Sequence, residues 1–353
     1  MSNIIIEKAS TTNIKNIDFK NLGFGKVFTD HLFEVDFIDG KWQTPKVVPF
    51  HNLVLHPATN FIHYGQTIFE GLKAFKDDNG DILVFRPKDN WKRMNKSAER
   101  VCMPAIPEDI FMGGLDALLK TDADWFPTEP GTSMYIRPVM FSLDAEIRVR
   151  PSDSYKFMIL ISPSGAYYSE PVKVKVEKHF VRASNGGVGF AKTAANYAAS
   201  LLPAKLAVEE GYHQLIWTDS KEHAYIEEAG TMNFMFVIDG KLITPQLSDS
   251  ILAGITRDSI IQLAKDLGMS VEEKRVSVNE VVSAIEQGRL QDAFGAGTAA
   301  TVSQISHIGN DGTVYELPKV SERIFSNKVA QILDSIKLGK TPDPHNWIHK
   351  ISK

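Results

Sequence analysis

The sequence lacks most of the features that mark secreted, membrane-spanning and nucleic-acid-binding proteins. Its 353 residues include one cysteine, Cys102, which excludes an internal disulfide and a cysteine-based metal site and fits a reducing cytosol. No segment approaches the roughly 18 consecutive apolar residues of a membrane helix. The first residues, MSNIIIEKASTTNIKN, contain three consecutive apolar residues and an early Glu7, which is too short a run for a secretory signal peptide. We therefore expect a cytoplasmic protein without a metal site, in which Cys102 is a core thiol.

An excess of basic charge is also absent. Lys and Arg number 39 against 43 Asp and Glu, which gives a net charge of −4, so neither nucleic acid nor an anionic membrane is favoured as a partner. The chain has no internal repeat and no low-complexity tract. With 43% hydrophobic residues it can bury a sizeable core, and its length favours two domains. A small-molecule partner is therefore expected.

Strand-like and helix-like segments occur in both halves of the chain. The expected strands, rich in β-branched and aromatic residues, are 82–85, 133–141, 155–163, 172–178, 213–218, 231–238 and 292–297. The expected helices are 89–101, 107–120, 194–211, 255–268 and 278–288. Ser, Gly, Pro and Tyr dominate SPSGAYYSEP, which indicates an interdomain linker. The predicted organisation is mixed α/β, with a smaller N-terminal domain (1–165), a linker (166–177) and a larger C-terminal domain (178–353).

One lysine, Lys192, lies among small residues in NGGVGFAKTAANY, residues 185–197. The glycines before it permit unusual φ values and close approach to a ligand, and the alanines after it leave space around the side chain. Such a setting can leave the amine partly desolvated, which favours its neutral, nucleophilic form. A surface lysine on a flexible glycine loop is the alternative interpretation of this window.

The same window has a second interpretation in another class of protein. GGVGFAKT, residues 186–193, resembles the phosphate-binding loop G-x-x-x-x-G-K-[ST] of nucleotide-hydrolysing proteins, with Ala191 at the second glycine. A strand-like segment precedes it, a helix-like segment follows, and Asp219 at the end of LIWTD resembles an acid that holds magnesium. The Cβ of Ala191 opposes this interpretation, because the backbone must wrap the phosphates at that position.

Three further motifs supply groups that attract charged ligands. YIEEAGTMNFMFV, residues 225–237, sets two acids beside a Gly-Thr turn, and a carboxylate buried there needs a cationic partner such as a protonated pyridine nitrogen. GITRDSIIQLAKDLG, residues 254–268, presents a helix start whose N–H groups suit a phosphate. FGAGTAATVS, residues 294–303, offers a second Gly-Thr turn. An amine, a carboxylate and two anion-binding turns are the parts that a pyridoxal phosphate site requires.

Over nearly its whole length the sequence resembles the branched-chain amino-acid aminotransferases, which are fold-type IV pyridoxal-phosphate enzymes, and in particular their longer subgroup. The matching segments are FGKVFTDHLFEVDF, LHPATNFIHYGQTIFEGLKAF, LVFRPKDNWKRMNKSAERVCMP, GTSMYIRPVM, GAYY, RASNGGVGFAKTAANY, EEAGTMNFMF, ILAGITRDS and FGAGTAATVS. This combination is highly specific and disfavours a nucleotide-hydrolysing protein. It implies two α/β domains with the cofactor between them.

The resemblance implies cofactor contacts at the matching positions. Lys192 resembles the lysine that forms a Schiff base with the cofactor. Glu228 resembles the carboxylate that pairs with the pyridine nitrogen, with Glu227 as the alternative if the motif is misread by one residue. Tyr197 matches a tyrosine that hydrogen-bonds the phenolic oxygen of the cofactor. Phosphate ligands and further cofactor contacts are expected at Arg93, Thr231, Ile255, Thr256 and Thr298, with Arg182 as a further arginine near the phosphate.

Substrate contacts are implied in the same way. The turn at Thr298 and Ala299 resembles the backbone site for the substrate α-carboxylate. Tyr135 and Arg137 are two apart in SMYIRPVMF and face one side of a strand, so Arg137 is expected to bind the second carboxylate of glutamate. The aromatic wall around a branched aliphatic side chain is expected from Phe24, Tyr64, Phe69, Tyr135 and Tyr167.

The sequence departs from the family at one place. Mammalian relatives carry a Cys-x-x-Cys after the FGAGT turn, where this chain has Ala300 and Ser303. The absence of both thiols excludes a redox switch at this position.

The implied reaction is transamination. Lys192 holds the cofactor, takes the Cα proton of leucine, isoleucine or valine, and returns it to the cofactor; 2-oxoglutarate then accepts the amino group as glutamate. Within the same fold, a D-amino-acid aminotransferase or an aminodeoxychorismate lyase keeps Lys192 and Glu228 but differs in the substrate wall. A noncatalytic binding protein is a further alternative. The resemblance also suggests a homodimer.

Overall fold

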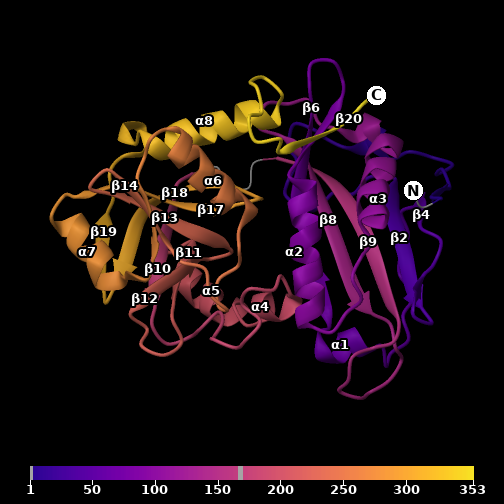
Figure 1. Ribbon diagram of the computed structural model, residues 1–353, viewed down its shortest axis with the longest axis horizontal. Helices are drawn as coiled ribbons and strands as arrows, with labels where there is room; N and C mark the ends of the chain where they lie inside the picture. The colour runs from indigo at the N-terminus through magenta and orange to yellow at the C-terminus, as the bar shows by residue number, and fades with distance from the viewer. Residues whose placement is uncertain (1–2, 166–169) are drawn as a thin grey trace. The chain divides into compact units, whose positions relative to one another are not determined.

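The computed structural model of the protein describes residues 3–165 and 170–353, and these residues divide into two compact units. Each unit has its own β-sheet, helices and apolar core (Figure 1). The first unit takes the described residues up to Gly165 together with Ala191–Ala194 and Ser335–Lys353, and the second takes Glu170–Phe190 and Ala195–Asp334. The predicted mixed α/β class is confirmed.

The first unit is built on one sheet with ten strands among the described residues. Their order is β1-β4-β2-β9-β8-β6-β7-β20, with β3 paired to β2 and β5 paired to β8. The strands are β1 (Ile5–Ile6), β2 (His31–Ile38), β3 (Lys41–Trp42), β4 (Lys46–Pro49), β5 (Thr67–Phe69), β6 (Leu72–Lys76), β7 (Ile82–Phe85), β8 (Ser133–Ser142), β9 (Tyr155–Ser164) and β20 (Ile348–Ile351). The antiparallel pair β8 and β9 is largely buried on both faces, which explains its nearly continuous apolar sequence.

Three helices of this unit are α1 (Asn60–Tyr64), α2 (Pro87–Arg100) and α3 (Glu108–Thr121). Helix α2 begins at Pro87, whose fixed φ and missing N–H are tolerated in a first helical turn. Helix α3 packs on β2, β4 and β9, where Phe111 stacks at 5.8 Å on Phe157, which in turn meets the edge of Phe33 at 5.9 Å. Burying each of these rings contributes roughly 1.5–3 kcal/mol to the stability of this core.

The second unit also has ten strands among the described residues, in the order β15-β14-β13-β17-β18-β10-β11-β12-β16, with β19 paired to β18. An additional pairing of β12 with β13 closes six of them into a ring. The strands are β10 (Val172–Glu177), β11 (Gln214–Thr218), β12 (Tyr225–Ala229), β13 (Met232–Ile238), β14 (Lys241–Pro245), β15 (Val271–Lys274), β16 (Val276–Ser277), β17 (Leu290–Gly297), β18 (Thr301–Asn310) and β19 (Thr313–Glu316). Each ring strand contributes a buried apolar residue to one core: Val174, Ile216, Ala229, Phe236, Ala293 and Ile305.

The remaining helices are α4 (Ala194–Ala198), α5 (Leu201–Glu209), α6 (Ile255–Asp266), α7 (Val278–Glu286) and α8 (Phe325–Lys337). Each strand and helix expected from the sequence is present, with one correction. The single helix expected over 194–211 is divided into α4 and α5. Pro203 is the third residue of α5, and a proline there prevents one helix from running through, because it lacks an N–H and its ring clashes with the carbonyl four residues earlier. No helix among the described residues has both the length and the apolar character needed to cross a membrane.

Two segments differ from the predicted domain boundaries. Residues 172–177, expected to end a linker, form β10, which pairs in parallel with both β11 and β18 inside the second sheet. Residues 335–353, expected in the C-terminal domain, belong to the first unit, where β20 pairs antiparallel with the edge of β7. With this addition the first unit has more described residues than the second, although it was predicted to be the smaller of the two. The boundary at residue 166 lies outside the described residues and stays a prediction.

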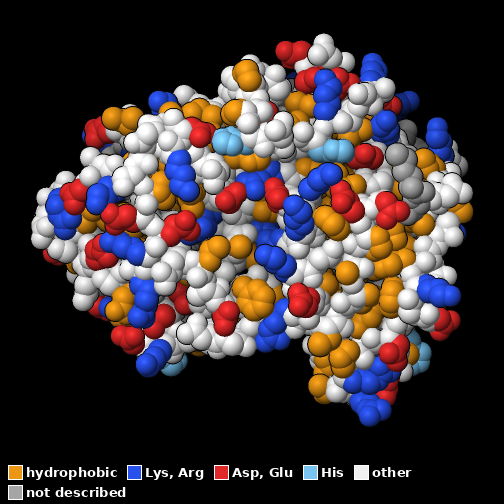
Figure 2. All heavy atoms as spheres, viewed as in Figure 1, with side chains coloured by type: hydrophobic (Ala, Val, Ile, Leu, Met, Phe, Trp, Pro, Cys, Tyr) orange, Lys and Arg blue, Asp and Glu red, His pale blue; other side chains and the backbone are white. Residues whose placement is uncertain are grey.

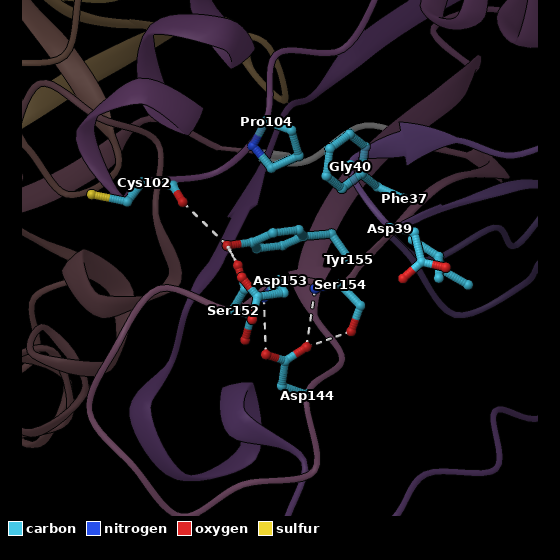
Figure 3. Close-up of a pocket in the computed structure, with 11 residues that line it drawn as sticks. Phe37, Asp39, Gly40, Cys102, Pro104, Asp144, Ser152, Asp153, Ser154 and Tyr155 are labelled. Atoms are coloured by element: carbon cyan, nitrogen blue, oxygen red, sulfur yellow. Dashed lines mark hydrogen bonds between the residues drawn. The ribbon is translucent and has the colours of Figure 1, made fainter.

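Cys102 is exposed, and the prediction of a core thiol was therefore wrong. It follows α2 with a left-handed φ of 56°, and its N–H donates to the Glu99 carbonyl at 3.2 Å. Its own carbonyl accepts a hydrogen bond from the Tyr155 hydroxyl at 3.1 Å. In Figure 3 the carbonyl of Cys102 points toward Tyr155, and the sulfur of Cys102 points away from Tyr155.

Candidate functional site

The backbone around Lys192 is held in place by the first unit. The Lys192 N–H donates to Ser97 Oγ in α2 at 2.9 Å, and its carbonyl accepts from the Phe69 N–H in β5 at 3.0 Å. The neighbouring Thr193 hydroxyl donates to the Thr67 carbonyl at 2.9 Å. A surface lysine on a flexible loop, the alternative interpretation of this window, is therefore wrong.

Several predicted substrate residues gather near the Lys192 side chain. Its Nζ lies 5.0 Å from the centre of the Phe69 ring, and the Arg137 guanidinium carbon lies 4.5 Å from the same ring. Arg137 Nη2 donates a hydrogen bond of 2.8 Å to the Tyr135 hydroxyl, and the edge of Phe24 meets the Tyr135 ring at 4.7 Å. Five residues predicted from four separate motifs (Phe24, Phe69, Tyr135, Arg137 and Lys192) thus form one continuous cluster, which we name the Phe69 cluster.

Arg137 has unused capacity for hydrogen bonding in this cluster. It lies on β8 two residues from Tyr135, on the same side of the strand as predicted. Its Nε is buried and has no hydrogen-bond partner among the described residues, where no carboxylate pairs with the guanidinium either. Arg137 therefore does not form a structural ion pair with a described residue. A guanidinium with an unused N–H beside an aromatic wall is suited to a carboxylate on a bound molecule.

Arg93, predicted as a phosphate ligand, pairs with a carboxylate that the sequence analysis did not single out. Its Nε and Nη2 donate to the two oxygens of Glu70 at 2.8 and 2.7 Å. The Glu70 side chain is completely buried between β5 and β6. The sequence does contain a signal for Glu70, which is an isolated acid within the mostly apolar segment TIFEGLKAF. A carboxylate buried in such a segment requires a cationic partner.

The remaining aromatic residues predicted for the substrate wall have different outcomes. Tyr64 ends α1 with 41% of its surface exposed, and its ring lies 6.1 Å from that of His63. It does not belong to the Phe69 cluster described above. Tyr167 lies outside the described residues, so its role stays a prediction.

In the second unit, Glu228 is buried on β12, where a backbone N–H and a guanidinium contact its carboxylate. Its Oε1 accepts the Leu252 N–H at 2.7 Å, and its Oε2 lies 3.2 Å from Arg182 Nε. Arg182 Nη2 donates to the carbonyl oxygens of Gly189, at 3.2 Å, and Ser250. The structure places the Arg182 guanidinium beside the Glu228 carboxylate, and the expected position of Arg182 near the phosphate stays a prediction.

Glu227, the alternative to Glu228, has a different environment. Adjacent residues of a strand point to opposite faces, and Glu227 Oε1 accepts a hydrogen bond from the Ser250 hydroxyl. Its Oε2 is buried without a hydrogen-bond partner among the described residues. Burial raises the pKa of Glu227, an effect that the Ser250 hydroxyl and the charge of Arg182 partly oppose and the charge of Glu228 reinforces. Of the two acids, Glu228 has the environment that suits a permanent charge.

The glycines before Lys192 serve close packing within the protein. A Cβ at Gly189 would lie 2.6 Å from Ser250 Cα, so only glycine lets this segment approach the chain that bonds Arg182 and Glu227. Tyr197 follows on α4, half-buried, and its carbonyl accepts from the Ser200 hydroxyl at 2.8 Å. Asn196 Nδ2 donates to the Val188 carbonyl at 2.9 Å, which connects α4 to the glycine segment.

The predicted phosphate contacts at Ile255 and Thr256 form the first turn of α6. Gly254 precedes them as N-cap without a side chain that could bond the first amides, and Thr256 is buried. A Cβ on Gly254 would collide with Asn233 Oδ1, while Asn233 Nδ2 donates to the Leu252 carbonyl at 2.9 Å. Asn233 therefore fixes the helix start, whose N–H groups and dipole attract an anion.

Two turns of the second unit carry the other predicted contacts. Thr298 and Ala299 lie in the turn between β17 and β18, and Thr301 after them has φ 53°, which is unusual for a β-branched residue. Thr231 is exposed in the turn between β12 and β13. The structure thus assigns Thr298 and Thr231 to separate turns of one unit.

Asp219 does not have the environment of a magnesium ligand. Its carboxylate accepts the N–H groups of Lys221, Glu222, Ala224 and Tyr225 at 2.9–3.3 Å, and these bonds lower its pKa despite partial burial. These contacts identify it as the residue that holds the turn between β11 and β12 together. Asp219 therefore does not support the interpretation of the chain as a nucleotide-hydrolysing protein.

A pocket of about 780 Å³ in the first unit contains none of the predicted site residues (Figure 3). Asp144 at its edge is already occupied, because it accepts the Asp153 and Ser154 N–H groups at 2.9 and 3.0 Å and pairs with Arg150 at 2.9 Å. Its carboxylate organises the loop before β9. We assign no functional site to this pocket.

Comparisons with known proteins show the family to which the chain belongs. The family model for amino-transferase class IV matches residues 67–308. Branched-chain-amino-acid transaminase 1 of Bacillus subtilis (strain 168) is 44% identical over 351 residues, covering 98% of this chain and 99% of the relative. A branched-chain aminotransferase structure from Thermoproteus uzoniensis with norvaline has a TM-score of 0.75 and 26% identity, and one from Escherichia coli has 0.73 and 27%; each comparison covers 90% of this chain and 99% of the other. The chain therefore belongs to the class IV aminotransferases, and within them to the branched-chain-amino-acid aminotransferases.

Proposed function

We propose that the protein exchanges amino groups between leucine, isoleucine or valine and 2-oxoglutarate, with Lys192 as the catalytic residue. The observation that carries this proposal is the Phe69 cluster, which brings the Lys192 amine near aromatic rings and a guanidinium that has an unused N–H. The aromatic surface suits a branched aliphatic side chain. The guanidinium suits the additional carboxylate that distinguishes glutamate and 2-oxoglutarate.

The residues present fit pyridoxal phosphate. Lys192 offers an amine, Glu228 offers a buried carboxylate to the ring nitrogen, and the start of α6 offers uncapped N–H groups to the phosphate. When bound, the cofactor supplies an electron sink for the charge that develops at the substrate Cα. Tyr197 and Thr298 are proposed as further contacts, to the phenolic oxygen and the phosphate.

Lys192 performs the proton transfers in this proposal. Its amine would hold the cofactor, and the same amine, once free, would take the proton from the substrate Cα and later give it back. The hydrogen bonds of the Lys192 backbone to Ser97 and Phe69 fix the Cα position from which the side chain reaches.

The test is an absorption spectrum of the holoenzyme before and after addition of single amino acids. We expect a visible band from cofactor bound to Lys192, which L-leucine, L-isoleucine, L-valine and L-glutamate convert to a near-ultraviolet band. Lys192→Ala should lower turnover by several orders of magnitude, because one residue provides both covalent binding and proton transfer. Lys205→Ala, which changes an exposed lysine of α5, is the matched control.

The same spectra separate the alternatives. Conversion by D-isomers instead of L-isomers would identify a D-amino-acid aminotransferase, and a coloured protein that no amino acid converts would identify a binding protein. Appreciable transamination by Lys192→Ala would contradict the assignment of Lys192.

We also propose a cytoplasmic homodimer. The first unit exposes apolar side chains on and before α1, including Ile62 at 52% and Val54 at 98%, and Figure 2 shows apolar atoms gathered over the α1 region. Phe28 and Phe50 stack at 5.3 Å while each stays more than a third exposed. Exposed apolar surface of this kind is typical of subunit contacts. The molar mass in solution tests this proposal.

A further inference from the structure

Arg182 connects two neighbouring carboxylates of β12 through contacts within the second unit. Its Nε lies 3.2 Å from Glu228 Oε2. Its Nη2 donates to the Ser250 carbonyl, and the Ser250 hydroxyl donates to Glu227. The guanidinium is therefore anchored by backbone oxygens on one side and faces Glu228 on the other.

The contact between Arg182 and Glu228 is electrostatic rather than a directed hydrogen bond. Arg182 Nε is buried and donates no hydrogen bond to any described residue, although it lies within ion-pair distance of Glu228 Oε2. Glu228 Oε1 meanwhile accepts the Leu252 N–H at 2.7 Å. The Glu228 carboxylate is thus oriented through Oε1, and its charge is stabilised through Oε2.

The burial of both partners makes this contact important for the charge of Glu228. The side chains of Arg182 and Glu228 are 9% and 4% exposed. A carboxylate at that depth loses most of its hydration and stays ionised only beside a cation. Arg182 provides that cation before any cofactor is bound.

We propose that Arg182 is a positioning residue for Glu228, which it holds ionised and oriented toward the ring nitrogen of the cofactor, and that it is not a ligand of the cofactor phosphate. This inference rests on the proposed function and deepens it. It replaces the role that resemblance alone gave to Arg182 with one that follows from its contacts.

The test compares three ligands that differ in the groups they present. Binding of pyridoxal phosphate, pyridoxal and inorganic phosphate to the apo-protein is measured by titration for wild type and Arg182→Gln. We expect Arg182→Gln to weaken pyridoxal phosphate and pyridoxal by the same factor, about 10- to 100-fold, as is typical when a partner behind a ligand is lost. Binding of inorganic phosphate should change less than about twofold, since the start of α6 is intact.

The opposite patterns overturn the proposal. Weaker binding of pyridoxal phosphate and inorganic phosphate with unchanged pyridoxal would make Arg182 a phosphate ligand. Equally weakened binding of all three ligands, with a lower unfolding temperature, would show that Arg182 is a structural residue. Unchanged binding of all three ligands would show that Arg182 does not position Glu228. Arg289→Gln, which breaks an exposed ion pair with Asp239 in the same unit, is the control that should change none of these values.

A double-mutant cycle with Glu228→Gln identifies the partner through which Arg182 acts. If Arg182 acts through Glu228, Arg182→Gln should add little to the loss caused by Glu228→Gln, whereas independent roles should multiply. Arg182→Lys, which keeps the charge and loses the guanidinium geometry, takes the place of Arg182→Gln if the latter does not fold. A wild-type protein without a visible cofactor band would contradict the proposed function, while a normal band with full additivity in the cycle would contradict this inference alone.

Discussion

Two buried Arg–Glu pairs, one in each unit, have different geometries. In the first unit Arg93 donates two hydrogen bonds to Glu70, at 2.8 and 2.7 Å, and this carboxylate is fully buried. In the second unit Arg182 approaches one oxygen of Glu228 at 3.2 Å without donating to it from Nε. We call the first, bidentate contact the closed pair and the second contact, which involves one carboxylate oxygen, the open pair.

The difference indicates how burial of charge can serve structure in one place and chemistry in another. A bidentate pair compensates the desolvation of both ions with two directed hydrogen bonds, so removal of either partner mainly costs stability. An ion pair with incomplete hydrogen bonding compensates the charge while leaving a lone pair available. The contacts of Arg93 and Arg182 join them to different carboxylates, Glu70 and Glu228.

The largest expected effect comes from breaking the closed pair. Glu70→Ala leaves the Arg93 guanidinium buried without its bidentate partner, and we expect the free energy of unfolding of the apo-protein to fall by about 3–5 kcal/mol. Urea unfolding followed by circular dichroism measures this change. Glu108→Ala, which breaks an exposed pair with Lys88, should cost less than about 1 kcal/mol. Similar losses for the two variants would show that the closed pair does not stabilise the first unit.

Breaking the open pair should affect catalysis more than stability. Glu228→Gln removes the charge that keeps the ring nitrogen protonated, and we expect the leucine half-reaction to slow by about 100- to 1000-fold. Cofactor affinity and unfolding should change less. Stopped-flow measurement of the cofactor band checks the rate. A severe effect of Glu227→Gln together with a mild effect of Glu228→Gln would show that the two acids have exchanged roles.

A third arginine, Arg137, sharpens the comparison because it has one hydrogen bond to Tyr135 and a buried Nε without a partner. We expect Arg137→Gln to lower kcat/KM for glutamate and 2-oxoglutarate by roughly 10- to 1000-fold, equivalent to about 1.4–4 kcal/mol, while leucine loses much less. Half-reaction kinetics with each donor measure the ratio. Equal losses for leucine and glutamate would assign Arg137 to the support of the fold or the cofactor.

Local patterns in the sequence predicted the parts of the candidate site that depend on neighbours in the chain. Alternation along β8 was enough to place Tyr135 and Arg137 on one side, and their hydrogen bond of 2.8 Å confirms it. The uncapped start of α6 follows from Gly254 before a helical pattern. Motif spacing also indicated that Lys192 and Glu228 have special environments.

Contacts between distant segments could not be predicted from such patterns. Glu70 and Arg93 are 23 residues apart, and neither residue type specifies the other as its partner. The strand β20 joins β7 from the C-terminal end of the chain, and the pairing of β12 with β13 closes a ring, because edge strands need hydrogen-bond partners that periodicity does not identify. The exposure of the Cys102 thiol likewise depends on a left-handed φ after α2.

The smallest expected effect concerns the second acid of β12 and appears as a change with pH. Burial, partly opposed by the Ser250 hydroxyl and Arg182, raises the pKa of Glu227 in the folded protein above the ordinary value of 4.5. Between that value and the raised pKa the folded protein binds more protons than the unfolded chain, so the free energy of unfolding falls as pH rises through this interval. The Glu227→Gln variant has no carboxyl proton to lose at this position. Its free energy of unfolding should therefore not fall in this pH interval for that reason.

The predicted difference between Glu227→Gln and wild type has a defined sign. The variant should become more stable relative to wild type as pH rises from 4 to 8, as measured by urea unfolding across that range. Glu272→Gln is the matched control of opposite sign, because a hydrogen bond from Lys241 lowers the pKa of Glu272, and its stabilising contribution is present above pH 4.5 and lost as pH falls. That variant should be less stable than wild type at pH 8 and approach it at low pH. If Glu227→Gln instead loses stability relative to wild type as pH rises, the pKa of Glu227 is lowered rather than raised in the folded protein.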